Sequence, residues 1–217
     1  TERAMDVEDQ WTHIEAARRS LAALLEGLSP AQWEAPSLCS EWRVRDVAAR
    51  VAMTPAGAPS TWEIVSGVVR ARGDLWGFGR DVARGWGADR TQADVVAILD
   101  REAASRRMPV VTTTANILLD VLVHSQDIAV PLDIDHPVPT DAGLAAFHRI
   151  WSMGWPFHAR KRLAGVTLAA SDADVRVGDG PEVRGPLAAL LLLTAGRAAA
   201  ARAQLEGPGL ALLPAGT

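Results

Sequence analysis

The amino-acid sequence predicts a mainly α protein, in which a helical bundle over residues 1–160 precedes a small α+β unit over residues 161–217. Two patterns carry this prediction. Apolar residues recur at helical spacing through most of the first part, and short β-branched segments alternate after Gly165. Helices that bury one face against each other form a bundle, whereas short strands next to a helix form a separate α+β layer.

The helical segments have identifiable ends. Residues 6–27 carry a regular apolar stripe and stop before Ser29-Pro30, and Ser40 is the predicted N-cap of a second helix with Val44 and Val51 on its apolar face. Pro55, Gly57 and Pro59 are expected to break the chain. Further helices are predicted at 61–72, 73–90, 91–106, 113–129, 140–153 and 186–204, with strands in "GVTLAAS", "ADVRVGD", "GDGPEVRG" and "GLALL".

The composition excludes several classes of protein. The 217 residues carry a net charge of −4 and no basic block, so a nucleic acid partner is not expected. Cys39 is the only cysteine, which rules out an intrachain disulfide. The longest apolar run, residues 186–195, is shorter than the ~20 residues that span a bilayer. We therefore expect a soluble cytoplasmic protein with no membrane or nucleic acid partner, as a monomer or homodimer.

The stretch "LLDVLVHSQDIAVPL" places Asp120, His124 and Asp127 on one face of a nearly all-apolar helix. Ionisable groups in such a helix must find partners or line a wet cavity. Three interpretations are open. Asp120 and His124 could ligate a divalent metal, with Asp127 as the hydrogen-bond acceptor of the imidazole. His124 could instead act as an acid or base oriented by a carboxylate, or the three residues could simply satisfy one another.

Three stretches resemble the mycothiol-dependent maleylpyruvate isomerase family, a branch of the DinB-like four-helix metalloproteins. They are "LSPAQWEAPSLCSEWRVRDVAARVA", "LLDVLVHSQDIAVPLDIDHPVP" and the C-terminal segment that begins "RLAGVTLAASDADVRVGDGPEVRG". The resemblance implies a DinB-like up-down four-helix bundle and a divalent metal held by three side chains. In actinobacterial members the metal activates the thiol of mycothiol, for isomerisation or S-transfer. Two of the metal positions correspond to Asp120 and His124.

The sequence departs from this family at the remaining ligand, because Arg50 stands where members have a histidine. A guanidinium is always protonated, so it offers no lone pair and repels a cation. In a bundle of this kind Arg50 would project toward Asp120, His124 and Asp127. It is then either a structural plug, paired with a carboxylate, or an anchor for an anionic group of a substrate, with His124 moving a proton.

We therefore predict a metal-free small-molecule enzyme whose catalytic residues are Arg50, Asp120, His124 and Asp127. It would isomerise, add to or cyclise an electrophilic or enolisable substrate in secondary metabolism, without a cofactor. Two alternatives stay open: a zinc- and mycothiol-dependent isomerase or S-transferase with Asp120 and His124 as ligands, and a non-catalytic small-molecule-binding protein. Aromatic residues would line the pocket or pack in the core; they are Trp42, Trp62, Trp76, Trp86 and Trp151. Cys39 is a buried hydrophobe or a nucleophile.

Overall fold

The structure is a computed structural model that describes residues 5–57, 75–110 and 112–213, with side chains from residue 81 onward in the second range. Its contacts divide the chain into two compact units, one over Asp6–His136 and one that begins at Pro137. The helix predicted at 61–72 lies outside the described residues. Within the part of the chain that is described, no helix has the length and apolar character needed to cross a membrane.

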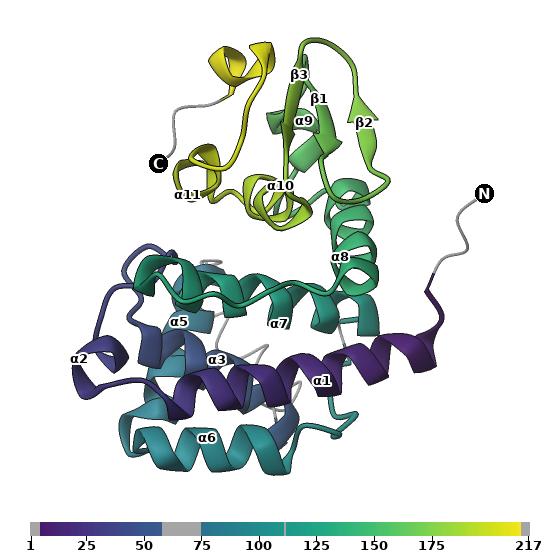
Figure 1. Cartoon of the computed structure of the whole chain (residues 1–217). Helices are drawn as coiled ribbons and strands as arrows, with labels where there is room; N and C mark the ends of the chain where they lie inside the picture. Colours follow the sequence, from purple (N-terminus) through teal and green to yellow (C-terminus); the bar gives the residue numbers. More distant parts are fainter. Residues whose placement is uncertain (1–4, 58–74, 111, 214–217) are drawn as a thin grey trace. The chain divides into compact units, whose positions relative to one another are not determined.

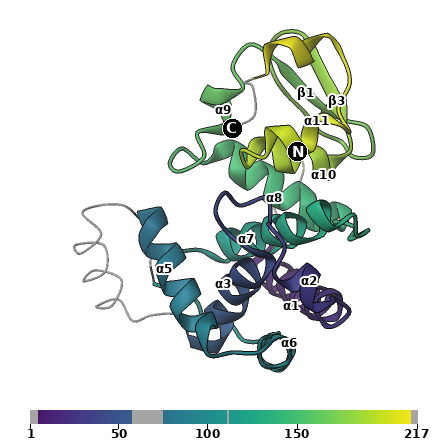
Figure 2. The ribbon, with the colours of Figure 1, turned by 90° about the vertical axis from the view of Figure 1, so that its left-hand side faces the viewer.

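The first unit is a helical bundle (Figure 1). Four helices form a closed ring in which each one packs against the next, and α5 covers the outer side of one of them (Figure 2). In ring order the four helices are α1 (Val7–Glu26), α6 (Gln92–Arg101), α3 (Val44–Gly57) and α7 (Thr114–Ala129). The helix outside the ring, α5 (Leu75–Ala88), packs on α3. The short helix α2 (Pro30–Trp33) precedes α3 in the chain. The predicted mainly helical fold is thus confirmed.

Helix α1 follows the predicted stripe closely. Asp6 caps its first turn by accepting a hydrogen bond from the Asp9 backbone N–H at 2.8 Å. The buried positions recur at spacings of three and four residues and consist of Trp11, Ile14, Arg18, Leu21, Ala22 and Leu25. One member of this stripe, Arg18, is charged, and it is as fully buried as its apolar neighbours.

Helix α3 begins at Val44, so Ser40, the predicted N-cap, lies in the preceding turn instead. The buried Asp46 side chain takes over the capping role. Its Oδ2 atom accepts a hydrogen bond from the Arg43 backbone N–H at 3.0 Å, and it also pairs with the Arg43 guanidinium. Pro55 does not break this helix, because it falls in the last turn before Gly57, whose positive φ ends the helix.

Helix α7 carries the acidic and histidine residues singled out above. The Thr113 side chain caps it by accepting a hydrogen bond from the Asn116 backbone N–H at 3.3 Å. Most of its residues are buried, since it is apolar nearly all round. Pro131 falls in the 3₁₀ turn η1 (Val130–Leu132), which ends the helix as predicted.

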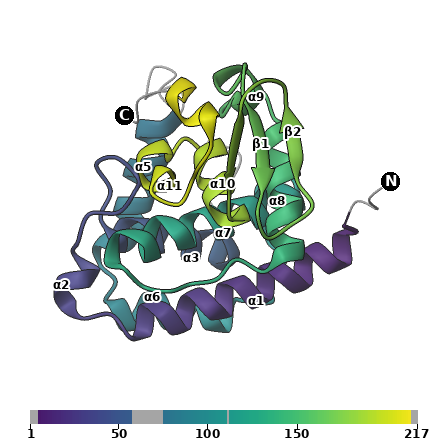
Figure 3. The ribbon, with the colours of Figure 1, turned by 45° about the horizontal axis from the view of Figure 1, so that its top comes forward.

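The second unit combines helices with a three-stranded sheet of order β2-β1-β3 (Figure 3). Strand β1 (Thr167–Ala170) pairs antiparallel with β2 (Arg176–Gly178) and parallel with β3 (Glu182–Gly185). Leu168, at the centre of β1, lies opposite Val177 on one side and Val183 on the other. Helix α10 (Leu187–Thr194) packs against α8 (Thr140–Ser152) and β1, and α9 (Ala159–Arg162) follows α8.

The C-terminal prediction of one long helix at 186–204 was wrong. The segment is broken into α10 and α11 (Ala198–Arg202) by Gly196, whose φ is 90°. The Gly196 and Arg197 N–H groups bond back to Leu193 and Leu192, which is the hydrogen-bond pattern of a Schellman motif.

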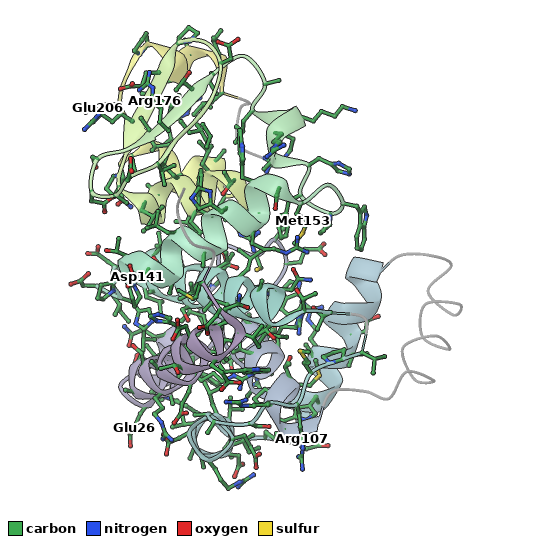
Figure 4. All side chains as sticks on the ribbon, turned by 90° about the vertical axis from the view of Figure 1, so that its right-hand side faces the viewer. Glu26, Arg107, Asp141, Met153, Arg176 and Glu206 are labelled. Carbon is green, nitrogen blue, oxygen red and sulfur yellow. The ribbon has the colours of Figure 1, made fainter. Side chains whose placement is uncertain are left out.

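The predicted strand "GLALL" was also wrong. It forms the 3₁₀ turn η2 (Pro208–Leu212), and the strand-like contact falls earlier, between Glu206 and Arg184. Glu206 and Arg176 both lie on the sheet end of this unit (Figure 4).

Along the chain, the division between the two compact units falls after His136, whereas the predicted domain boundary is residue 160. The difference has a simple cause, because α8 packs against α10 of the second unit. The end of the helical bundle is therefore set by the contacts of α8 rather than by the change from helix to strand in the sequence. The division into two domains over residues 1–160 and 161–217 stays a prediction.

Candidate active site

Helices α3 and α7 pack against each other and bring the predicted polar residues together. Arg50 comes from the middle of α3, and Asp120, His124 and Asp127 come from α7. The spacing of four and three residues turns all three α7 side chains toward the same side of that helix. The charged residues therefore form one continuous group inside the first unit.

Arg50 and Asp120 form an ion pair across the two helices. The Arg50 Nη2 atom donates a hydrogen bond to Asp120 Oδ1 at 3.0 Å, and Nη1 donates to the Thr54 hydroxyl at 3.3 Å. The side chains are 32% and 25% exposed, so the pair is reachable from solvent. A guanidinium has five N–H groups, and among the described residues Arg50 uses two of them. Arg50 can therefore bind a further acceptor without releasing Asp120.

His124 lies between two carboxylates. Its Nδ1 atom is 2.9 Å from Asp127 Oδ2, in hydrogen-bond contact, and its Nε2 atom is 3.6 Å from Asp120 Oδ1. The Asp127 side chain has no solvent exposure, whereas that of His124 is 16% exposed. The buried carboxylate thus fixes the ring, and Nε2 faces the more open side, where Asp120 and Arg50 lie.

Cys39 also belongs to this group, which the sequence did not reveal. Its Sγ atom donates a hydrogen bond to Asp127 Oδ2 at 3.1 Å and lies 3.8 Å from His124 Nδ1. The Leu38 backbone N–H donates to the Asp127 carbonyl at 3.0 Å, which holds the loop before α3 against α7. Cys39 and His124 are 85 positions apart, so no local spacing could have joined them.

The electrostatic setting keeps a proton on His124. Burial alone would lower the pKa of His124, but the negative charge of Asp120 and the hydrogen bond to Asp127 outweigh it and raise the pKa to about 10. At neutral pH the ring is an imidazolium, and its Nδ1–H donates to Asp127.

A divalent cation of the kind the family resemblance implies does not fit beside Asp120 and His124. Arg50 Nη2 sits 3.0 Å from Asp120 Oδ1, the carboxylate oxygen that also lies 3.6 Å from His124 Nε2. A zinc–carboxylate bond is about 2.0–2.2 Å, and the guanidinium both repels the ion and holds the acceptor. If Arg50 occupies the position of a family ligand, as the resemblance implies, a fixed positive charge takes the place of that ligand.

A second donor set consists of Cys39, His124 and Asp127, whose ligand atoms lie within 4.8 Å of one another. Hydrogen bonds already connect these three side chains, because Asp127 Oδ2 accepts from both Cys39 and His124. A cation here would have to displace both protons and move the imidazole out of its hydrogen bond. In this structure the three side chains form a hydrogen-bonded network that orients His124, and the same atoms offer a thiol, an imidazole and a carboxylate as possible ligands to a cation.

The aromatic residues predicted to line a pocket are spread along the chain. Trp42 precedes α3 and is half-buried, and Trp86 stacks under the Arg90 guanidinium at 4.0 Å. Trp151 lies in the second unit, where it stacks on Phe147. Trp62 and the side chain of Trp76 lie outside the described residues. Their role in a pocket stays a prediction.

Comparisons with known proteins agree with this fold and with the family resemblance of the stretch "LSPAQWEAPSLCSEWRVRDVAARVA". Residues 14–108 match a family model described as the mycothiol maleylpyruvate isomerase N-terminal domain, and this range includes Cys39 and Arg50. A crystal structure of the mycothiol-dependent maleylpyruvate isomerase superposes with a TM-score of 0.55 and 16% identity, covering 94% of this chain and 93% of the other. A histidine-to-alanine mutant of that enzyme gives a TM-score of 0.54, also at 16% identity. The curated proteins contain no match.

Fold and site together define a helical protein with the maleylpyruvate isomerase fold and a charged, partly open group within its bundle. Residues 14–108 are similar to the N-terminal domain of the mycothiol maleylpyruvate isomerase family. At 16% identity the solved structures establish the fold alone.

Proposed function

We propose that this protein is a metal-free cytoplasmic enzyme that moves a proton on a small enolisable molecule carrying an anionic group. One observation carries the proposal: Arg50, Asp120, His124 and Asp127 form an unbroken chain of contacts that is buried at Asp127 and partly exposed at Arg50. The side chains nearest to solvent in this chain of contacts are a cation, Arg50, a carboxylate, Asp120, and an acid, His124. A polar cluster that only stabilises the fold does not require these three groups at its solvent-exposed end.

The proposed roles follow from the positions of the atoms. Arg50 binds the anionic oxygen of the substrate and stabilises the enolate as charge develops there. Asp120 accepts the proton that leaves carbon, and His124 Nε2 delivers a proton at the new position. Asp127 keeps the ring oriented through Nδ1. The 3.6 Å between Asp120 Oδ1 and His124 Nε2 lets the proton return to His124, which restores the starting state.

Proton exchange tests this proposal without knowledge of the natural substrate. Small 2-oxo acids, beginning with pyruvate and 2-oxoglutarate, are incubated in D₂O and their C–H signals followed by NMR. We expect enzyme-dependent exchange that falls at least ~100-fold in Arg50→Ala and in His124→Gln. Arg19→Gln, which alters an exposed arginine on α1, is the matched control and should exchange normally.

Unchanged exchange in Arg50→Ala would remove Arg50 from the mechanism. Saturable binding of the acids without any exchange would instead favour a non-catalytic binding protein, which is the third interpretation of the sequence.

The metal content of an Arg50→His variant separates the proposal from a zinc- and mycothiol-dependent enzyme. The substitution restores an imidazole next to Asp120 and His124 and removes the fixed charge, so we expect stoichiometric zinc in this variant after loading and dialysis. The unaltered protein, treated identically, should retain far less. Elemental analysis that finds one zinc per chain in both proteins would contradict the metal-free proposal.

A further inference from the structure

The imidazole of His124 has different neighbours at each of its two nitrogen atoms. Nε2 lies 3.6 Å from Asp120 Oδ1, and the proposed proton transfer takes place on this side of the ring. Nδ1 lies 2.9 Å from Asp127 Oδ2 and 3.8 Å from Cys39 Sγ. A thiol, an imidazole nitrogen and a carboxylate oxygen therefore come together at a point that the proposed mechanism uses only to orient the ring.

The separations of these three atoms are close to those of ligands around one tetrahedral ion. Zinc bonds of about 2.0–2.3 Å at tetrahedral angles place their ligand atoms about 3.3–3.6 Å apart. In the structure the sulfur–nitrogen, nitrogen–oxygen and sulfur–oxygen distances are 3.8, 2.9 and 3.1 Å. Each distance lies within about half an ångström of the tetrahedral value, so small side-chain rotations bring all three atoms to bonding distance.

The position and chemistry of the group also favour a cation. Asp127 has no solvent exposure, but Cys39 is half-buried in a loop and is followed by the exposed Ser40. The thiol is therefore on the side of the group that solvent reaches, where water can serve as a fourth ligand. Sulfur and imidazole ligands select zinc over magnesium or calcium. The Arg50 guanidinium binds Asp120, on the Nε2 side of the ring, and so holds a different carboxylate.

We propose that Cys39, His124 and Asp127 form a reversible inhibitory site for a zinc ion. Binding releases the thiol proton of Cys39 and the Nδ1 proton of His124 to solvent, and the ion takes bonds from Sγ, Nδ1 and Oδ2. The ring is then neutral and keeps only its Nε2 proton, so it no longer serves as the acid. Because two protons and two hydrogen bonds are given up, dialysis removes the ion. The inhibition rests on the proposed function, whereas the site itself does not.

Absorption spectroscopy with Co²⁺ tests the site without an assay of activity. Cobalt occupies the tetrahedral sites of zinc, and a cobalt–thiolate bond gives a charge-transfer band in the near ultraviolet. Cys39 is the only cysteine, so the band reports this site alone. We expect the band when Co²⁺ is added to the unaltered protein, and its loss when excess zinc follows.

Variants show whether the three side chains bind the ion together. Cys39→Ser should abolish the band and weaken zinc binding at least ~10-fold, since even residues beyond the ligands change metal affinity ~10–100-fold. Ser40→Ala, which alters the exposed neighbour, is the matched control and should keep both. His124→Gln should weaken cobalt binding as well. An unchanged cobalt affinity in this variant would show that the thiol acts alone, which overturns the site, as does the absence of the band from the unaltered protein.

The exchange assay in D₂O tests the inhibition and separates the two proposals. The zinc concentration that halves exchange should match the zinc affinity measured by displacement of cobalt. Zinc that displaces cobalt without slowing exchange overturns the inhibitory role. If the band forms but the protein catalyses no exchange, the proposed function fails and the zinc site stands. If exchange proceeds and no band forms, the zinc site fails and the proposed function stands.

Discussion

His124 shows how a single residue can be set to one protonation state by its neighbours. It is flanked by Asp127 at Nδ1 and Asp120 at Nε2, and each carboxylate favours the imidazolium. Arg50 weakens the effect of Asp120 on the ring, because the ion pair with Arg50 partly neutralises the charge of that carboxylate. In the proposed mechanism, a proton taken up by Asp120 removes one of these two negative charges and lowers the pKa of the ring, so proton uptake by Asp120 and proton donation by His124 are coupled.

The raised pKa of His124 predicts how stability depends on pH. The folded protein holds the proton up to a pH of about 10, while the unfolded chain loses it near ~6.5. The imidazolium therefore contributes its full stabilisation below about pH 6.5 and loses it progressively as the pH rises through the folded pKa. Urea unfolding of the protein and of His124→Gln should show a gap that is large at pH 6 and narrows toward pH 10.

An NMR titration of the His124 ring provides the direct check. A midpoint well above neutrality supports the ion network, whereas a midpoint near that of free histidine would show that Asp120 and Asp127 do not hold the proton.

Arg50 and Arg18 illustrate what a sequence says about charged residues in a core. The departure from the family at Arg50 could be recognised because a motif surrounds it. Arg18 had a weaker signal: it interrupts an otherwise regular apolar stripe at a position where helix geometry points inward. A charged residue at such a position is buried only if the fold provides partners, and the carbonyls of Ala103 and Ser105 come from a distant loop.

At the scale of elements, α7 matters most because it places three of the four proposed catalytic side chains. Its first turn depends on the Thr113 cap. Thr113→Ala should therefore lower the free energy of unfolding by about 1 kcal/mol, since the Asn116 N–H loses its acceptor. Thr112→Ala is the matched control, because Thr112 precedes the cap. Equal losses in chemical denaturation of the two variants would contradict the capping role.

The elements that were predicted well are those whose signals are local. Helix α1 and helix α7 have regular apolar patterns and a side chain that caps the first turn, and both were found within a residue or two of their ends. The errors lie where backbone geometry competes with composition. Residues 186–204 are strongly helix-forming, yet the left-handed conformation at Gly196 and the carbonyls it satisfies divide them into two helices.

At the scale of the whole molecule, the chain comprises two compact units, and every residue of the candidate active site comes from the first one. The second unit contributes its own core, built on α8, α10 and the β1–β3 pair. The change from helical to alternating patterns after Gly165 marked the strands, whereas the contacts divide the chain after His136. Packing of α8, a feature between distant elements, decided that boundary.

The sequence by itself determined the mainly helical fold, the similarity of its N-terminal region to the maleylpyruvate isomerase family and the alignment of Asp120, His124 and Asp127 on one helix face, because helical periodicity and motif spacing are local properties. Only the tertiary structure decided that Cys39 shares Asp127 with His124, that Arg50 takes hold of Asp120, and that Arg18 is buried with an unused donor. These contacts join residues about 70 to 90 positions apart, and such contacts depend on which helix faces pack together.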